Sequence, residues 1–319
     1  MSYLESTEQQ PELAPDNVSA DQPKQQASAN VTDAFQEPDN NDTVSVIADE
    51  SSNMPIQRNS TSLIYALGLV HVVFPNKGLE KQFLAAARAL GVNEKNYYAV
   101  FTNNNSTSEP DKYLYLAEQV DWVLSIESER VYVLTPASKS ELTALINTLK
   151  PPADTLEQVY TCVIGNAYWQ DNSLGLEAVL CQQVYSHTMS ELHDTIKNIS
   201  TAETNAIQDV IKSLELAPNK GRSNDDRAKN FIAFRYPDIY AHTHSMQTGS
   251  ASGKSASLIK IGFTQFDASS EHSIVDITFT YQENSSEKKH SYFCRVDVSG
   301  LYPFINTAIQ PFTPIQPRL

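Results

Sequence analysis

The sequence lacks the features that mark several large classes of protein. Its 319 residues include only three cysteines, Cys162, Cys181 and Cys294, which lie far apart without a C-x-x-C pair. Neither a disulfide framework nor a zinc ribbon is therefore indicated. There is no run of about 18 apolar residues that could span a bilayer. The first residues, MSYLESTEQQ, have neither the basic nor the apolar part of a secretory signal. We expect a soluble, cytoplasmic protein with reduced thiols.

Positive charge is also scarce. The chain has 23 Lys and Arg against 38 Asp and Glu, which gives a net charge of −15. Residues 1–60 hold −9 of this charge, leaving −6 for residues 61–319. Nucleic acids and anionic membranes are bound through clusters of Lys and Arg that neutralise phosphate charge. We therefore expect neither nucleic acid nor membrane as a partner.

The composition changes sharply near residue 61. Residues 1–60 are rich in Gln, Asn, Ser, Asp, Glu and Pro, and such a segment cannot bury enough apolar surface to offset its conformational entropy. We predict a disordered acidic tail over 1–60 and a folded domain over 61–319. Within that domain we consider two possible subdomains, 61–185 and 186–319.

The sequence of the folded part predicts an α+β fold. The run TSLIYALGLVHVVFP is apolar along nearly its whole length, as in a strand buried on both faces. Capping-box spacings at Ser138 and Thr188 predict two helix starts, and Pro237 predicts a break in a late helical stretch. Alternating apolar residues predict a C-terminal three-stranded antiparallel meander over 259–263, 275–281 and 292–298. We expect mixed sheet and helices before this meander, and no regular element in the proline-rich residues 303–319.

The stretch TGSASGKSAS, residues 248–257, comes close to a phosphate-binding loop. Such a loop requires four residues between its glycines, a strand before it and a helix after it. Here Gly249 and Gly253 are separated by three residues, and the segment is predicted to follow a helix and enter a strand. We interpret it as a flexible Gly/Ser connection, and we assign no cofactor to the chain.

Two histidines are candidate metal ligands. His242 and His244 could supply two imidazoles to a metal ion, the commonest nitrogen ligands in proteins. On a helix, however, side chains two positions apart point in nearly opposite directions. Histidines at the surface or at a helix end are the alternative interpretation.

A group of charged residues opens the late helix. Arg222, Asp225, Asp226 and Arg227 could form an interaction cluster. The structural alternative is equally simple, because acids in the first turn of a helix are stabilised by its dipole. The chain has no G-x-S-x-G elbow, and we assign no catalytic residue.

Four stretches taken in order resemble a known family. They are SLIYALGLVHVVFP, WVLSIESERVYVLTP, RSNDDRAKNFIAFR and HSYFCRVDVSGLYPF. Over residues 61–313 the chain resembles the C-terminal domain of the cyanobactin maturation proteases, the PatA/PatG-type proteins of ribosomal peptide biosynthesis. In that family the domain is attached to subtilisin-like protease domains and has no established catalytic activity. The present chain has no subtilisin Asp, His or G-T-S-M-A segment.

The resemblance implies a pathway more firmly than a reaction. We expect a non-catalytic binding or assembly module that engages a precursor peptide or a peptide-modifying enzyme of the same pathway. One alternative is a peptide-modifying enzyme, with a metal held by His242, His244 and a distant third ligand. A second alternative is a structural dimerisation domain, so a homodimer is also considered.

Overall fold

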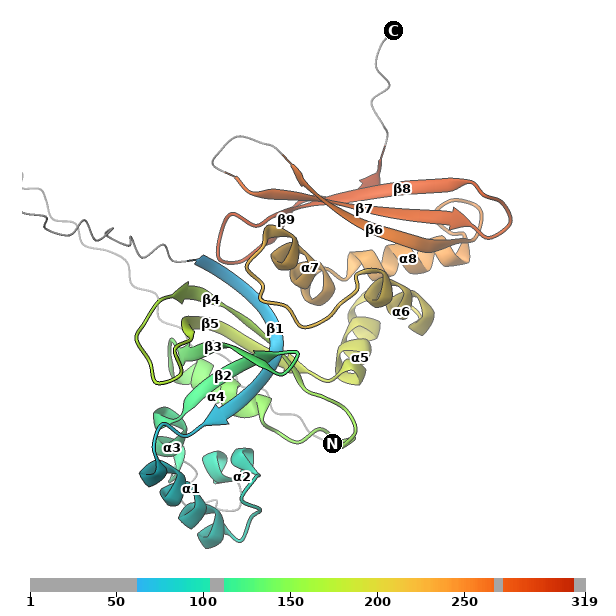
Figure 1. Cartoon of the computed structure of the whole chain (residues 1–319). Coiled ribbons are helices and arrows are strands. Elements are labelled where there is room, and N and C mark those ends of the chain that lie inside the picture. Colours follow the sequence, from blue (N-terminus) through green and yellow to red (C-terminus); the bar gives the residue numbers. More distant parts are fainter. Residues whose placement is uncertain (1–61, 104–111, 267–271, 313–319) are drawn as a thin grey trace, which may run out of the picture. The chain divides into compact units, whose positions relative to one another are not determined.

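The computed structural model describes residues 62–103, 112–266 and 272–312. The predicted tail over 1–60 lies outside these residues. The described part of the chain forms a β-barrel with its own helices, followed by a helical layer and a second sheet (Figure 1). None of its helices combines the length and the apolar character needed to cross a membrane.

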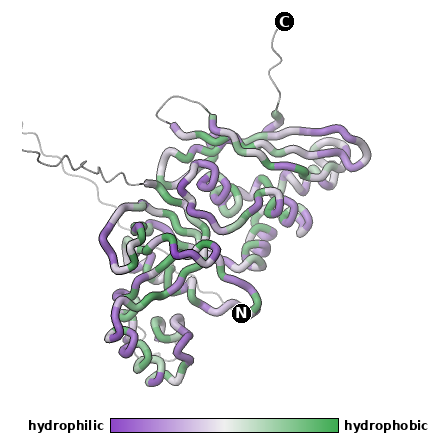
Figure 2. The backbone as a smooth tube through the Cα atoms, viewed as in Figure 1, coloured by the Kyte–Doolittle hydropathy of each residue, from purple (hydrophilic) through white to green (hydrophobic). Residues whose placement is uncertain are grey.

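Five strands close into the barrel. In order around it they are β1 (Ser62–Val73), β2 (Asp121–Ile126), β3 (Glu129–Pro136), β5 (Glu177–His187) and β4 (Tyr160–Tyr168). All neighbouring pairs are antiparallel except β3 and β5, which run parallel. The apolar composition of β1 follows from this position, since both faces of its first half are buried. Hydrophobic residues accordingly concentrate along the barrel strands (Figure 2).

Four helices accompany the barrel: α1 (Lys77–Leu90), α2 (Tyr97–Thr102), α3 (Leu114–Gln119) and α4 (Lys139–Thr148). The α1 helix begins at Asn76, whose side chain accepts a hydrogen bond from the Leu79 backbone N–H, and ends at the left-handed Gly91. The α2 helix was not predicted, because six residues are too few for a clear helical period. Its Phe101 nevertheless joins an aromatic core with Phe83 and Trp122.

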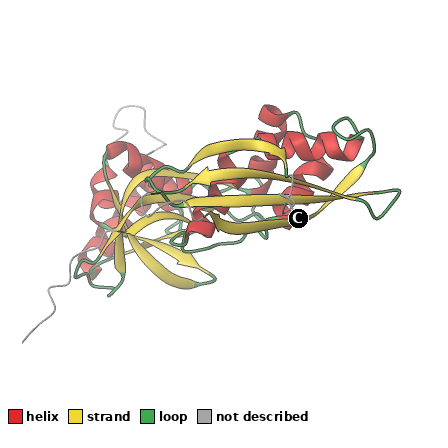
Figure 3. Ribbon diagram, turned by 90° about the horizontal axis from the view of Figure 1, so that it is seen from above, coloured by secondary structure: helices red, strands yellow, loops and turns green. Residues whose placement is uncertain are grey.

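The second half of the chain packs helices against one face of a sheet. The helices are α5 (Met189–Ser200), α6 (Thr204–Ser213), α7 (Asn224–Arg235) and α8 (Asp238–Thr248). The strands are β6 (Ala256–Phe266), β7 (Ile274–Glu283), β8 (Lys289–Asp297) and β9 (Phe304–Pro311), antiparallel and in that order. Helices α6, α7 and α8 lie beneath the sheet, whose other face is turned away from them (Figures 1 and 3).

The α+β class is confirmed, and one part of the prediction is wrong. The C-terminal sheet has four strands, since the proline-rich end that was expected to be irregular forms β9. β9 is an edge strand, and Pro311 stands at its last position, where the missing N–H of a proline removes little pairing. The predicted break at Pro237 is confirmed, because α7 ends at Arg235 and α8 begins at Asp238.

A short segment between α6 and α7 joins the helical layer to the barrel. The first half of β1 pairs with β4 on one edge, and Asn219 and Gly221 pair with its other edge. Leu67 exchanges two backbone hydrogen bonds with Asn219, at 3.1 and 2.8 Å, and the Tyr65 N–H donates to the Gly221 carbonyl at 2.9 Å. Gly221 has φ +60°, and an added Cβ would lie 2.0 Å from the Tyr65 carbonyl oxygen. Only glycine fits this close approach.

Candidate functional site

The Gly/Ser stretch connects a helix to a strand, as predicted. Gly249 ends α8 in the left-handed conformation, and the chain enters β6 at Ala256. This order is the reverse of the one that a phosphate-binding loop requires. The Lys254 ammonium lies 3.3 Å from the Glu283 carboxylate at the end of β7. The lysine that resembled a phosphate ligand therefore pairs with a carboxylate of the chain itself.

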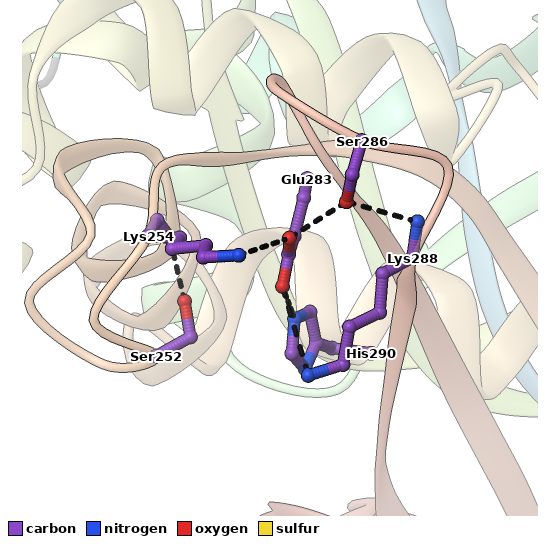
Figure 4. Close-up of polar contacts among 6 residues, drawn as sticks. All are labelled: Ser252, Lys254, Glu283, Ser286, Lys288 and His290. Carbon is purple, nitrogen blue, oxygen red and sulfur yellow. Dashed lines mark hydrogen bonds and ion pairs between the residues drawn. The ribbon is translucent and has the colours of Figure 1, made fainter.

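Glu283 is the centre of a closed polar cluster (Figure 4). Its side chain is only 2% exposed. The Ser286 hydroxyl donates to it at 2.7 Å, the His290 imidazole nitrogen lies 3.0 Å away, and the Lys288 ammonium lies at 3.8 Å. Hydrogen bonds from Ser286 and His290, with a further contribution from Lys254, lower the pKa of Glu283 to about 2. Because the Glu283 carboxylate has so many partners, we interpret the cluster as structural. It joins the Gly/Ser stretch to the turn between β7 and β8.

The charged residues at the start of α7 contact several different elements. Ser223 caps the helix by accepting a hydrogen bond from the Asp226 backbone N–H. Arg222 forms an ion pair with Glu177 of β5, whereas Asp225 accepts a hydrogen bond from Gln265 of β6 at 2.6 Å. These contacts extend toward both sheets and favour the structural interpretation of the group.

Arg227 points in yet another direction. It is 3% exposed and donates hydrogen bonds to the carbonyls of Val298 and Gly300, in the connection between β8 and β9. Burial lowers the pKa of Arg227 to about 10, so the side chain still carries its charge at neutral pH. Arg227 therefore fixes α7 to the second sheet, and it does not lie with Arg222 in one binding surface.

The two candidate metal ligands lie on α8. His242 is half-buried against two tyrosines, with ring centroids 5.6 Å from Tyr281 and 4.3 Å from Tyr292. Burial lowers the pKa of His242, which favours its neutral form. In the described part of the chain, no three His, Cys, Asp or Glu side chains gather as metal ligands would. Among the described residues, His242 thus lies in an aromatic environment without a third potential metal ligand beside it.

A buried tyrosine pair lies where the barrel meets α7. The hydroxyls of Tyr65 on β1 and Tyr185 on β5 are hydrogen-bonded to each other. The Arg235 guanidinium of α7 stacks over the Tyr185 ring, 4.4 Å from its centroid. Burial raises the pKa of both tyrosines above their ordinary value of 10.0. Both hydroxyls are therefore neutral at physiological pH. Their hydrogen bond joins β1 to β5, and the stacking of Arg235 on Tyr185 brings α7 against the barrel.

An apolar pocket opens beside this pair. It has a volume of about 290 Å³, and its walls come from β1, β4, β5, α5, α7 and the segment before α7. The His187 ring at the end of β5 stacks on Phe234 of α7, with centroids 6.4 Å apart and planes at 14°. Burial lowers the pKa of His187, so its ring is neutral at pH 7. Residues that shape the pocket are Leu67, Tyr160, His187, Met189, Leu192 and Phe234.

No motif in the sequence predicts this pocket. Its lining residues are isolated apolar or aromatic positions, each of which also fits an ordinary core residue. The one local signal was the capping box at Thr188, whose hydroxyl accepts from the Glu191 N–H at 3.1 Å. That capping box stands between the end of β5 at His187 and the start of α5 at Met189, two residues that both line the pocket.

Two protein-family models match the chain. The model described as PatG Domain matches residues 63–214, and the model described as PatG C-terminal matches residues 197–312. Together the two matches show a PatG-type domain over residues 63–312. A solved structure named PatG Domain of Unknown Function has a TM-score of 0.56 and 16% identity to it. The alignment covers 79% of this chain and 98% of that one, and at such identity it shows a shared fold. A search of curated proteins found no match.

The pocket lies where the two PatG-type regions meet. Leu67, Tyr160 and His187 belong to the part matched by PatG Domain, and Phe234 belongs to the part matched by PatG C-terminal. The two matches overlap over residues 197–214, which contain the end of α5 and the whole of α6. This pocket, built by both matched regions, is the best candidate for a functional site.

Proposed function

We propose that this protein is a non-catalytic binding or assembly module in the biosynthesis of a ribosomally made, modified peptide of the cyanobactin kind. It would engage the precursor peptide or a peptide-modifying enzyme of the same pathway. The observation that carries the proposal is the apolar pocket of about 290 Å³ beside His187 and Phe234. Ligand sites are concave and mostly apolar with a few polar groups, and this pocket has the size to take one large side chain.

The state of the cysteines supports binding without covalent catalysis. Burial raises the pKa of Cys162, Cys181 and Cys294 to about 12 in each case. The thiolate is the nucleophilic form of cysteine, and it is scarce at neutral pH when the pKa is this high. These side chains suit packing better than attack on a peptide.

Calorimetry tests the proposal. The full chain is titrated with the precursor peptide and, separately, with each peptide-modifying enzyme encoded beside its gene. We expect saturable binding to at least one of them, with the peptide recovered at unchanged mass after incubation. Absence of binding to all of them would contradict a binding role, and a changed peptide mass would contradict a non-catalytic one.

A further inference from the structure

A second cavity lies on the other side of Met189. It has a volume of about 450 Å³ and runs between α5 and α6. Its lining residues recur at helical spacing on each helix, so each helix turns one face toward the cavity. Met189 borders both cavities and is 40% exposed. The polar lining residues are Ser190, His193 and Asp194 from α5, and Thr204, Gln208 and Lys212 from α6.

His193, which lines this second cavity, has a polar atom without a partner among the described residues. The Nε2 atom of His193 is buried and makes no hydrogen bond among the described residues. A buried nitrogen without a partner costs free energy, and native proteins leave few of them. The amide backbone of a peptide offers both a donor and an acceptor at each residue, so it could satisfy either tautomer of His193 once the imidazole ring rotates into the cavity.

The charge around the two cavities favours one kind of peptide. Residues 186–218 contain five Asp and Glu against two Lys. Residues 61–319 as a whole carry a net charge of −6. An acidic peptide would be repelled at such a surface, whereas a neutral or basic one would be attracted.

We propose that an extended, neutral or basic peptide lies along the α5–α6 cavity and inserts one bulky apolar side chain into the pocket beside Phe234. Its backbone would hydrogen-bond His193 after the imidazole ring rotates into the cavity, while its apolar side chain would pass Met189. The inference rests on the proposed binding function and adds the residue type that is recognised. The peptide backbone would occupy the α5–α6 cavity, and the apolar side chain would occupy the pocket beside Phe234.

Three pools of nine-residue peptides test the type of side chain. They share randomised neutral and basic flanks, and their central residue is Phe, Ala or Glu. Burying a Phe side chain contributes far more than burying Ala. We expect the Phe pool to bind the full chain at least about tenfold more tightly than the Ala pool, and the Glu pool to bind most weakly.

Two variants on α5 test the location. Met189→Glu places a charge between the two cavities at an exposed position, where the fold should tolerate it. We expect it to weaken binding of the Phe pool about tenfold or more. The matched control is Ile199→Glu, also on α5 and 58% exposed but outside both cavities, which should leave affinity unchanged.

His193→Phe tests the polar half of the site. Removal of a nitrogen that forms no hydrogen bond should leave the fold intact, yet weaken peptide binding several-fold if the peptide backbone is its partner. Unchanged affinity in His193→Phe would overturn the assigned position of the backbone. Unchanged affinity in Met189→Glu, or equal binding of the Phe and Ala pools, would overturn the pocket as the site of recognition.

The outcomes separate the two proposals. If precursor peptide binds but ignores the central residue and the α5 variants, the binding function stands and the recognition mode is wrong. If neither the three pools nor the precursor peptide binds, both the recognition mode and peptide binding are wrong.

Discussion

The Glu283 cluster and the α5–α6 cavity differ in whether their buried polar groups have hydrogen-bond partners. Glu283 is buried and surrounded by Ser286, His290 and two lysines, so its carboxylate is fully engaged within the chain. The buried Nε2 atom of His193, a residue that lines the α5–α6 cavity, has no partner among the described residues. The loop that resembled a phosphate site in the sequence places Lys254 in this closed cluster, whereas no motif in the sequence indicates the α5–α6 cavity. Here a buried polar atom without a hydrogen bond, close to an apolar pocket, indicates a binding site better than a partial sequence motif does.

The largest effect is expected at the segment that builds one wall of the pocket. Gly221→Ala adds a Cβ 2.0 Å from the Tyr65 carbonyl oxygen, at φ +60°. The left-handed backbone and the steric overlap together should cost about 3 kcal/mol or more of unfolding free energy. Urea denaturation measures this loss. The control is Gly253→Ala in the Gly/Ser loop, where φ is +74° and an added Cβ would have no neighbouring described residue within 4 Å. This variant should lose only about 1–2 kcal/mol of unfolding free energy.

Arg227 gives the next largest effect. Arg227→Met keeps much of the side-chain volume but leaves the carbonyls of Val298 and Gly300 without their donor. We expect a loss of about 2–3 kcal/mol of unfolding free energy, since buried acceptors would remain unpaired. Arg222→Met is the matched control at an exposed ion pair with Glu177, and it should cost less than about 1 kcal/mol. Equal losses would mean that Arg227 contributes no more than a surface pair.

Glu283 should make the free energy of unfolding decrease at acidic pH. Its pKa in the folded protein is about 2, against an ordinary value of 4.5. Because the folded pKa is the lower of the two, the stabilisation is fully present above pH 4.5 and is lost as the pH falls toward 2. In Glu283→Gln this part of the pH dependence should disappear. Urea midpoints of both proteins between pH 7 and pH 2.5 measure the difference, and parallel curves would contradict the closed cluster.

His193→Phe should have the smallest effect on stability. The Nε2 atom has no hydrogen bond to lose, so we expect a change within about 0.5 kcal/mol or a slight stabilisation. Thermal denaturation measures it without any ligand. A large loss of stability would show that His193 has a structural partner, and the contrast between the closed cluster and the open cavity would then be wrong.

The features that depend only on residues close together in the sequence could be predicted from it. The capping box at Thr188 and the break at Pro237 stand where their local chemistry requires. The closure of the barrel could not be predicted, because it depends on the parallel pairing of Tyr132 with Glu177 across a long separation in sequence. The pocket could not be predicted for the same reason, since Leu67 and Phe234 meet only after the segment around Asn219 pairs with β1.

Photo-crosslinking tests the central claim most directly. A nine-residue peptide with basic flanks carries p-benzoylphenylalanine at its centre, and the irradiated complex with the full chain is digested and mapped by mass spectrometry. The account predicts that the label attaches to Met189 or to another residue of the pocket beside Phe234, and that the Phe peptide competes with it. A label concentrated elsewhere, such as on the exposed Phe304 of β9, would contradict it.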